Sequence, residues 1–202
     1  MKFKRIIFTL LYSEGNFFLS RNFRLQKVGN LAWLKKNYSF GKVCEYVDEI
    51  MILLVTKNPS HEKRKAFLAD ISNFREKIFV PMTIGGGIKN LNDAKMYIDN
   101  GADKILINQL IHSNIKLVSN ISQLFGSQAL SVMADIRKEN GNYFSYFDSG
   151  KIKSYEIKKY FKKIKNINFG ELIINSINND GTGFAFDKEI VKIIPSTLKN
   201  PI

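Results

Sequence analysis

Short apolar runs alternate along the chain with longer amphipathic segments, and this alternation is the feature that most constrains the fold. Near-continuous apolar strands separated by helices are typical of a parallel sheet built from βαβ units. The apolar runs predict six strands, at residues 5–10, 49–55, 79–84, 104–108, 130–136 and 171–176. The segments between and after them predict six helices, at residues 31–42, 61–77, 91–100, 114–125, 154–165 and 187–194. A small hairpin is expected where residues 143–147 and 151–153 flank Asp148-Ser149-Gly150.

The number of βα units limits the architecture. A closed (β/α)8 barrel typically needs about 250 residues, and this chain has 202. Six units fit either an open sheet or a C-terminally incomplete barrel, in which the first and sixth strands are open edges. No Pro- or Ser-rich linker divides the sequence, so residues 1–202 are expected to form a single domain.

Composition excludes several classes of protein. The chain is 45% hydrophobic and 24% charged, which argues against intrinsic disorder. No run approaches the 18 apolar residues of a membrane-spanning helix. A single cysteine, Cys44, excludes a disulfide framework and a Cys-rich zinc site, and it fits a reducing compartment. We therefore expect a cytoplasmic protein with no metal and no cofactor.

The net charge of +13 is compatible with a nucleic-acid partner, an anionic small molecule or a lysine-rich composition alone. The densest basic run is residues 151–165, where apolar residues recur at helical spacing between lysines. No recognised nucleic-acid motif accompanies it. We interpret the run as a solvated helix face and predict neither a nucleic-acid partner nor a membrane partner.

Polar groups follow four successive predicted strands, at the strand ends where parallel α/β proteins place their chemistry. They are Gly85-Gly86-Gly87, Asn108, Asp135 and Asp180-Gly181-Thr182. Three consecutive glycines let the backbone approach a ligand and direct N–H groups toward an anion. Each of these residues alone could be a loop cap, whereas together they predict a site at one edge of the sheet.

A second pattern lies at the opposite ends of the strands. Arg5, Glu49, Lys104 and Glu171 each stand at the start of a predicted strand. If buried, two cations and two anions must pair, because a single buried charge is costly. The alternative, a set of solvent-exposed strand ends, stays open on the pattern alone.

Several segments together resemble the HisF family, the cyclase subunit of imidazole glycerol phosphate synthase. They are KRIIFTLLYSEGNFFLSRNF, VPMTIGGGIKNLNDAKMYIDNGADKILIN, ISQLFGSQALSVMADIRK and GELIINSINNDGTGFAFDKEI. The resemblance implies a fold of the TIM (β/α)8-barrel type. It also implies a HisH-like glutaminase partner at the amino ends of the strands, and a phosphorylated small molecule at the carboxyl ends.

The resemblance also implies roles for individual residues. Asp135 matches one of the two catalytic aspartates of the cyclase. A ring that gates ammonia corresponds to Arg5, Glu49, Lys104 and Glu171, and Asp103 matches a residue that contacts the glutaminase. Part of one phosphate site corresponds to Gly86, Gly87 and Asn108, and residues near the substrate correspond to Asp180 and Thr182.

The chain departs from the family at three positions. Leu11 stands where the second catalytic aspartate is expected, Leu19 replaces a loop lysine, and Leu54 replaces an aspartate that ends the second strand. Leucine cannot transfer a proton, so acid–base chemistry through a carboxylate pair is lost. The seventh and eighth strands, whose loops form the second phosphate site of the family, are not expected within these residues.

Three hypotheses follow. With leucine at position 11, the TLLY segment also resembles the glycosyl amidation-associated proteins of the WbuZ type. Those proteins are found with a HisH-like glutaminase and an N-acetyl sugar amidotransferase. The first hypothesis is an ammonia-channelling subunit of that kind. The second is a cyclase of histidine biosynthesis, a lyase. The third is a basic binding protein without catalytic activity, that is, a pseudoenzyme.

Overall fold

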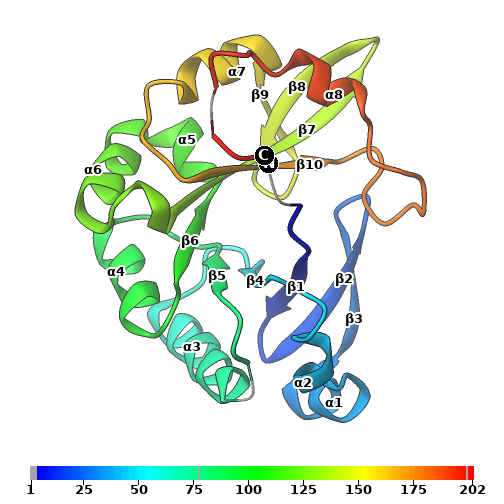
Figure 1. Ribbon diagram of the computed structural model, residues 1–202, viewed down its shortest axis with the longest axis vertical. Helices are drawn as coiled ribbons and strands as arrows, with labels where there is room; N and C mark the ends of the chain where they lie inside the picture. Colours follow the sequence, from blue (N-terminus) through cyan, green and yellow to red (C-terminus); the bar gives the residue numbers. More distant parts are fainter. Residues whose placement is uncertain (1–3, 77, 199) are drawn as a thin grey trace. The chain divides into compact units, whose positions relative to one another are not determined.

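The computed structural model describes residues 4–76, 78–198 and 200–202. Within them the chain is a mixed α/β protein with a mostly parallel sheet and eight α-helices, as expected for a fold of the (β/α)8-barrel type. The chain divides into two compact units (Figure 1). The first unit comprises Met1–Leu19 and Leu25–Ile105, and the second comprises Ser20–Arg24 and Leu106–Ile202.

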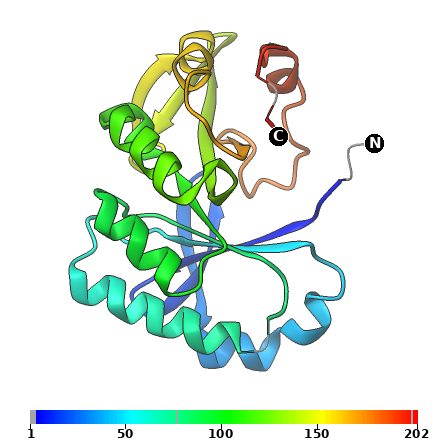
Figure 2. The ribbon, with the colours of Figure 1, turned by 60° about the vertical axis from the view of Figure 1, so that its left-hand side comes forward.

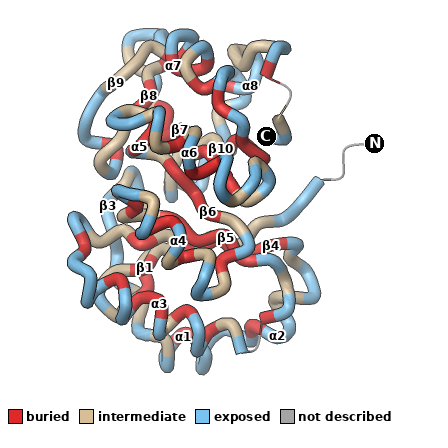
Figure 3. The backbone as a smooth tube through the Cα atoms, turned by 90° about the vertical axis from the view of Figure 1, so that its left-hand side faces the viewer, coloured by how far each residue is buried: buried red, intermediate tan, exposed pale blue. Residues whose placement is uncertain are grey.

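Parallel strands form the centre of the first unit. These are β1 (Ile7–Ser13), β4 (Glu49–Leu54) and β5 (Met82–Gly85), and β6 (Lys104–Ile107) follows β5 in the strand order. Ile7 pairs with Glu49 and Ile50 pairs with Met82, so the amino ends of the strands are nearly level. Every residue of β5 and all but one of β4 are buried, as the red segments of Figure 3 show. Strand β5 begins later than the predicted residue 79, after Pro81, and Phe79 is exposed.

The sequence did not predict the two strands that follow β1. Strand β2 (Asn16–Arg21) returns antiparallel to β1, with Leu11 opposite Phe18, and β3 (Arg24–Asn30) continues the meander. Glu14 and Gly15 form the first turn with positive φ angles of 47° and 75°. The expectation that β1 is an open edge is therefore wrong for its second half, which β2 covers.

Helices α3 (His61–Arg75) and α4 (Leu91–Asp99) flank the parallel strands of the first unit (Figure 2). Ser60 and Asn90 cap their amino ends through side-chain oxygens, which accept hydrogen bonds from backbone N–H groups of the first turn. The predicted helix at residues 31–42 is instead two short helices, α1 (Leu31–Asn37) and α2 (Phe40–Val43). They are separate because Tyr38 is extended, with φ −115° and ψ 120°.

The second unit combines one parallel pair with an antiparallel ribbon. Strand β10 (Glu171–Ser176) runs parallel to β7 (Leu130–Glu139). On its other side β7 pairs antiparallel with β8 (Asn142–Phe147), which pairs with β9 (Ile152–Glu156). The hairpin predicted around Asp148-Ser149-Gly150 is thus confirmed, and all three of those residues have positive φ.

The helices of the second unit are α5 (Gln109–Ser113), α6 (Ile115–Phe125), α7 (Ile157–Ile164) and α8 (Glu189–Ile193), with a 3-10 turn at Ser127–Ala129. Helix α7 begins three residues after the predicted start, because residues 154–156 belong to β9. The end of the helix predicted at residues 61–77 includes Lys77, which lies outside the described residues.

Neither a spanning helix nor a metal cluster occurs in the described part of the chain. No helix there is long and apolar enough to cross a bilayer. No group of three or more His, Cys, Asp or Glu side chains among the same residues could hold a metal ion. Cys44 is a free thiol.

Candidate functional site

Three of the four charged residues predicted at the strand starts meet in the first unit. They are Arg5, Glu49 and Lys104, and together with Thr83 we call them the ion cluster. Oε2 of Glu49 accepts a hydrogen bond from Lys104 Nζ at 2.6 Å and one from Arg5 NH1 at 3.3 Å. Its other oxygen, Oε1, accepts a hydrogen bond from the Thr83 hydroxyl. The carboxylate at the start of β4 thus accepts from three donors, which lie just before β1 and at the starts of β5 and β6.

Burial makes the ion cluster sensitive to the loss of any member. The Glu49 side chain is 2% exposed, that of Lys104 18% and that of Arg5 41%. A buried carboxylate is tolerated only when opposite charges and hydrogen bonds compensate it. Glu49 has both, whereas Arg5 is open enough for water or another molecule to reach it.

The fourth predicted ring member, Glu171, begins β10 in the second unit. It is buried, and its Oε1 accepts a hydrogen bond from Ser131 Oγ at 2.7 Å. The two residues lie opposite each other in the β7–β10 register. Glu171 is therefore a paired residue at the amino end of its strand, like Glu49 in the first unit.

Asp103, the residue predicted to contact a glutaminase, lies just before β6 and accepts a hydrogen bond from the backbone of β5. Its Oδ2 accepts a hydrogen bond from the N–H of Met82 at 2.8 Å and lies 3.6 Å from Arg75 NH2. The N–H of Asp103 in turn donates to the Met82 carbonyl at 2.9 Å. Because the side chain is 44% exposed, Asp103 can still meet a partner while it holds the start of β5.

The glycine turn after β5 is held from several directions. Gly86 has φ +93°, and a Cβ there would come within 2.0 Å of the Leu54 carbonyl oxygen, so only glycine fits. The Tyr97 hydroxyl donates to the Gly86 carbonyl at 2.8 Å, and Arg64 NH2 donates to the Gly87 carbonyl at 2.9 Å. The turn is rigid, which is what a backbone anion site requires.

Arg64 adds a positive charge to this turn that sequence reasoning missed. Its side chain is only 9% exposed, and its NH1 lies 3.6 Å from an Asp93 oxygen. Its Nε is buried without a hydrogen-bond partner in the described structure. The helical spacing of the sequence could have revealed this arginine, because position 64 shares the buried face of α3 with Phe67, Leu68 and Ile71.

Asp135 forms the centre of a carboxylate–amide cluster in the second unit. It lies inside β7, which extends to Glu139, beyond the predicted end at residue 136. Asn108, just after β6, donates from Nδ2 to Asp135 Oδ2 at 2.8 Å. Asn175 on β10 donates from Nδ2 to the other oxygen at 3.2 Å. Both carboxylate oxygens are therefore fixed by amides, and the Oδ1 of Asn108 is left buried without a partner.

The environment of Asp135 prepares it for proton transfer near neutral pH. Burial raises the pKa of Asp135 to about 7. Hydrogen bonds from Asn175 and Asn108 lower the pKa, and the negative charge of Asp180 raises it, but burial dominates. A carboxyl group with a pKa close to the working pH can both give and accept a proton.

Asp180 and Thr182, predicted near the substrate, make structural contacts within the second unit. Oδ2 of Asp180 accepts hydrogen bonds from Ser20 Oγ at 2.5 Å and from the N–H of Phe23 at 2.9 Å, and its carbonyl accepts from the N–H of Asn22. Thr182 Oγ1 donates to the Asn179 carbonyl at 2.9 Å. Asp180 therefore holds the turn between β2 and β3.

The three leucines that depart from the family pattern lie in strands of the β1–β2–β4 group. Leu11 is in β1, opposite Leu53 of β4, and Leu54 is buried at the end of β4. Leu19 in β2 is 59% exposed. None of them offers a group that titrates or donates a hydrogen bond from its side chain.

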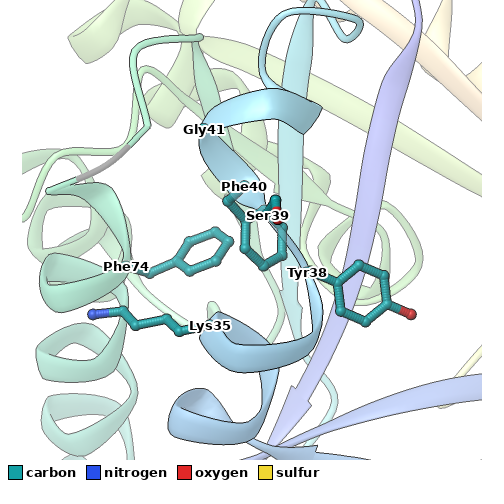
Figure 4. Close-up of a pocket in the computed structure, with 6 residues that line it drawn as sticks. All are labelled: Lys35, Tyr38, Ser39, Phe40, Gly41 and Phe74. Atoms are coloured by element: carbon teal, nitrogen blue, oxygen red, sulfur yellow. The ribbon is translucent and has the colours of Figure 1, made fainter.

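A pocket of about 210 Å³ lies elsewhere in the first unit, between α2 and α3 (Figure 4). Aromatic rings dominate its walls, and Phe40 meets Phe74 edge to face with ring centres 4.6 Å apart. The Lys35 amine points away from the aromatic rings and donates a hydrogen bond to the Asn73 carbonyl. The lining contains no titratable group other than Lys35 and Tyr38, so the pocket is separate from the predicted chemistry.

Comparisons with known proteins identify relatives over the whole chain. A family model described as histidine biosynthesis protein matches residues 42–202. A protein of Parasynechococcus marenigrum with the provisional name imidazole glycerol phosphate synthase subunit hisF2 is 36% identical over 100% of this chain and 75% of its own length. The HisF subunits of Chlorobaculum tepidum and Saccharolobus solfataricus are 32% and 33% identical, over 78% and 79% of their lengths.

The family model covers most of the chain, and each of these relatives is more than 30% identical over more than two thirds of its own length. They bear out the resemblance found in the glycine turn, the Asp135 segment and the Asp180 segment. The chain therefore belongs to the histidine biosynthesis protein family and is a HisF-like subunit of the imidazole glycerol phosphate synthase type.

Proposed function

We propose that this HisF-like chain receives ammonia from a HisH-like glutaminase that docks at the amino ends of β1, β4, β5 and β6. The ammonia is then used, with an N-acetyl sugar amidotransferase, to amidate a sugar in surface polysaccharide synthesis. The observation that carries the proposal is the ion cluster, in which Glu49 binds Arg5, Lys104 and Thr83.

The ion cluster suits a gate for a small neutral molecule. Lys104 and Arg5 share a single carboxylate oxygen, so displacing one cation leaves the other to hold the charge of Glu49. Thr83 keeps the second oxygen fixed meanwhile. Movement of the Lys104 amine therefore opens space without leaving a bare buried carboxylate. Glu171 with Ser131 forms a separate polar pair in the second unit.

The leucine at position 11 supports sugar amidation over cyclisation. A cyclase that uses two carboxylates for acid–base work loses a factor of about 10²–10⁴ in rate when one is missing. Leu11 lies in a hydrophobic pairing with Leu53, where an aspartate would need a new polar partner.

A phosphorylated ligand is proposed to bind at the turn formed by Gly86 and Gly87 in the first unit. Both glycine carbonyls already accept hydrogen bonds from side chains, so the turn is fixed before a ligand arrives. Arg64 lies beside Gly87 with its Nε unpartnered, while its NH1 is 3.6 Å from an Asp93 oxygen.

The test mixes the chain with its cognate HisH-like glutaminase and measures co-elution and glutamine hydrolysis. We expect a complex in which the glutaminase is faster than alone. Lys104→Ala should reduce ammonia transfer to the acceptor more than it reduces folding stability. Asp103→Asn keeps an acceptor for the Met82 N–H but removes the charge, so it should weaken docking with little effect on folding. Absence of a complex, or unchanged behaviour of both variants, contradicts the proposal.

A second candidate function is the cyclase reaction itself, and the geometry of Asp135 favours it. That carboxyl group has a pKa of about 7 and is held at both oxygens. The assay supplies the histidine-pathway substrate with an ammonium salt as nitrogen donor. Turnover that disappears in Asp135→Asn would establish the cyclase, whereas no turnover would exclude it.

A further inference from the structure

Helix α7 carries an exposed row of lysines on the side away from its packing face, and we call it the lysine face. The face consists of Lys158, Lys159 and Lys162 in the helix and Lys165 at its carboxyl end. The packing face is formed by the buried residues Ile157, Tyr160, Phe161 and Ile164. Helix α7 lies against the β8–β9 ribbon of the second unit (Figure 1). It packs there with its buried residues, and the four lysines are exposed.

No anion of the described chain neutralises the lysine face. None of its four amines forms an ion pair in the described residues, although the neighbouring Lys153 pairs with Glu139 at 2.7 Å. Lys163, at the border of the face, donates to the Tyr155 hydroxyl at 2.8 Å. Residues 151–165 contain seven lysines and one glutamate, so almost half of the net charge of +13 lies in this segment.

Folding stability does not explain the lysines at the start of α7. Lys158 and Lys159 occupy the first turn of α7, where the helix dipole favours acidic side chains, and the turn has none. Lys158 and Lys162 are four residues apart, a spacing at which like charges repel. The dipole favours Lys162, which lies in the last turn, but Lys158 and Lys159 weaken the start of the helix. An external anion would relieve that penalty and the repulsion between the lysines.

The chemistry of the face favours a surface of lipid headgroups. Clusters of four to eight basic residues on an amphipathic helix are typical of binding to anionic lipids. The aromatic rings of α7 are buried, so no stacking platform for nucleic-acid bases is exposed with the lysines. The apolar residues of α7 are buried as well, so the contact would be electrostatic and would not insert into the bilayer.

We propose that the lysine face of α7 docks the chain on an anionic lipid bilayer. This proposal does not depend on the proposed ammonia transfer. It replaces the expectation from the sequence that the chain has no membrane partner. The docking is peripheral, is driven by the four exposed amines, and weakens as salt screens them.

The experiment uses the whole chain and sediments it with vesicles of phosphatidylcholine mixed with phosphatidylglycerol, and with vesicles of phosphatidylcholine alone. The test variant is Lys158→Gln/Lys159→Gln/Lys162→Gln. The matched control is Lys65→Gln/Lys95→Gln/Lys116→Gln, which removes the same charge from exposed positions on α3, α4 and α6. Circular dichroism verifies that both variants fold.

We expect binding to the anionic vesicles only, and its loss at about 0.5 M salt. Each lysine near an anionic surface contributes about a fivefold factor in affinity, so the test variant should bind about a hundredfold more weakly. The control should stay within a factor of about five of the natural chain. Equal weakening of both variants would mean that net charge alone acts. That result, no binding to anionic vesicles, or tighter binding to a duplex oligonucleotide than to the vesicles would overturn the proposal.

Discussion

At the scale of single residues, Asp135 couples the stability of the fold to pH. Its pKa is about 7 in the folded chain, against an ordinary value of 3.8. Between these two values the unfolded chain releases the proton and the folded chain retains it. Stability therefore falls as the pH rises from about 4 to about 7, and this contribution changes no further above the folded pKa.

We expect Asp135→Asn to remove this dependence. Urea unfolding of both proteins at about pH 5 and about pH 8 should show the natural chain losing about 2–3 kcal/mol more than the variant over that interval. Asp99→Asn, at an exposed position of α4, is the control and should follow the natural chain. Parallel pH profiles for the natural chain and Asp135→Asn would contradict the burial of an ionisable group at this position.

Glu49 is the second residue with a large predicted effect. Glu49→Gln leaves the Lys104 amine, whose side chain is 18% exposed, beside a neutral amide. Breaking a buried pair in this way costs about 3–5 kcal/mol, and the partial exposure of Arg5 places the expected loss near the lower value. The measurement is the free energy of unfolding in urea.

Two further variants separate charge from packing at Glu49. Glu45→Gln, at an exposed position, should change stability by less than about 0.5 kcal/mol. Adding Lys104→Met to Glu49→Gln should recover part of the loss, because the buried cation is removed together with its partner. No recovery in the double variant would show that the loss has another cause.

At the scale of elements, the alternation of apolar and amphipathic segments predicted the parallel strands because each is a nearly continuous apolar run. Strand β3 was not predicted, because its sequence RLQKVGN is mostly exposed and lacks such a run. Helix α5 was missed since five residues are too few to show helical periodicity. Strand β3 is instead defined by its pairing with β2.

The same limit applies to the candidate site. The glycine turn, Asn108 and Asp135 could be found from their positions at the carboxyl ends of the predicted strands, although β7 continues past Asp135 to Glu139. The role of Asp180 could not, because its partners Ser20 and Phe23 are about 160 residues away in sequence. Glu49 could be predicted as a charge at a strand start, but its hydroxyl donor Thr83 lies on another strand and is a common strand residue.

The glycine turn after β5 gives a prediction at this scale. In Gly86→Ala the new Cβ would meet the Leu54 carbonyl oxygen at 2.0 Å, in addition to the cost of a positive φ. Gly15→Ala is a matched control, because φ is +75° there and no atom lies within 4 Å. We expect about 1–2 kcal/mol of destabilisation for the control and clearly more for Gly86→Ala in thermal unfolding. Equal losses would mean that β4 can move away from the turn.

At the scale of the whole molecule, the chain passes between its two units more than once. The Ser20–Arg24 turn belongs to the second unit, although the residues on both sides of it belong to the first. Asp180 provides its attachment, through the Ser20 hydroxyl and the N–H groups of Asn22 and Phe23. Gly181 allows the close approach, since a Cβ there would lie 2.1 Å from the Ser20 carbonyl oxygen.

We expect Asp180→Ala to free this turn selectively. Amide hydrogen exchange at Phe23, which loses its acceptor, should become at least tenfold faster, while exchange at Ile52 in β4 should stay unchanged. Asp180→Asn retains an acceptor oxygen and should show a smaller effect. Uniformly faster exchange over both units would indicate global destabilisation and contradict a local attachment.

The attachment of Ser20 to Asp180 also has a consequence for the order of events during synthesis. The two residues are separated by 160 positions. At about 5–20 residues per second, a ribosome needs on the order of 10–30 s to add Asp180 after Ser20. Strands β1 and β4 can pair within that time, but the tip of the β2–β3 hairpin has to wait for its acceptor. The hairpin tip therefore leaves the ribosome before β4 does, but it reaches its final position after β1 and β4 have paired.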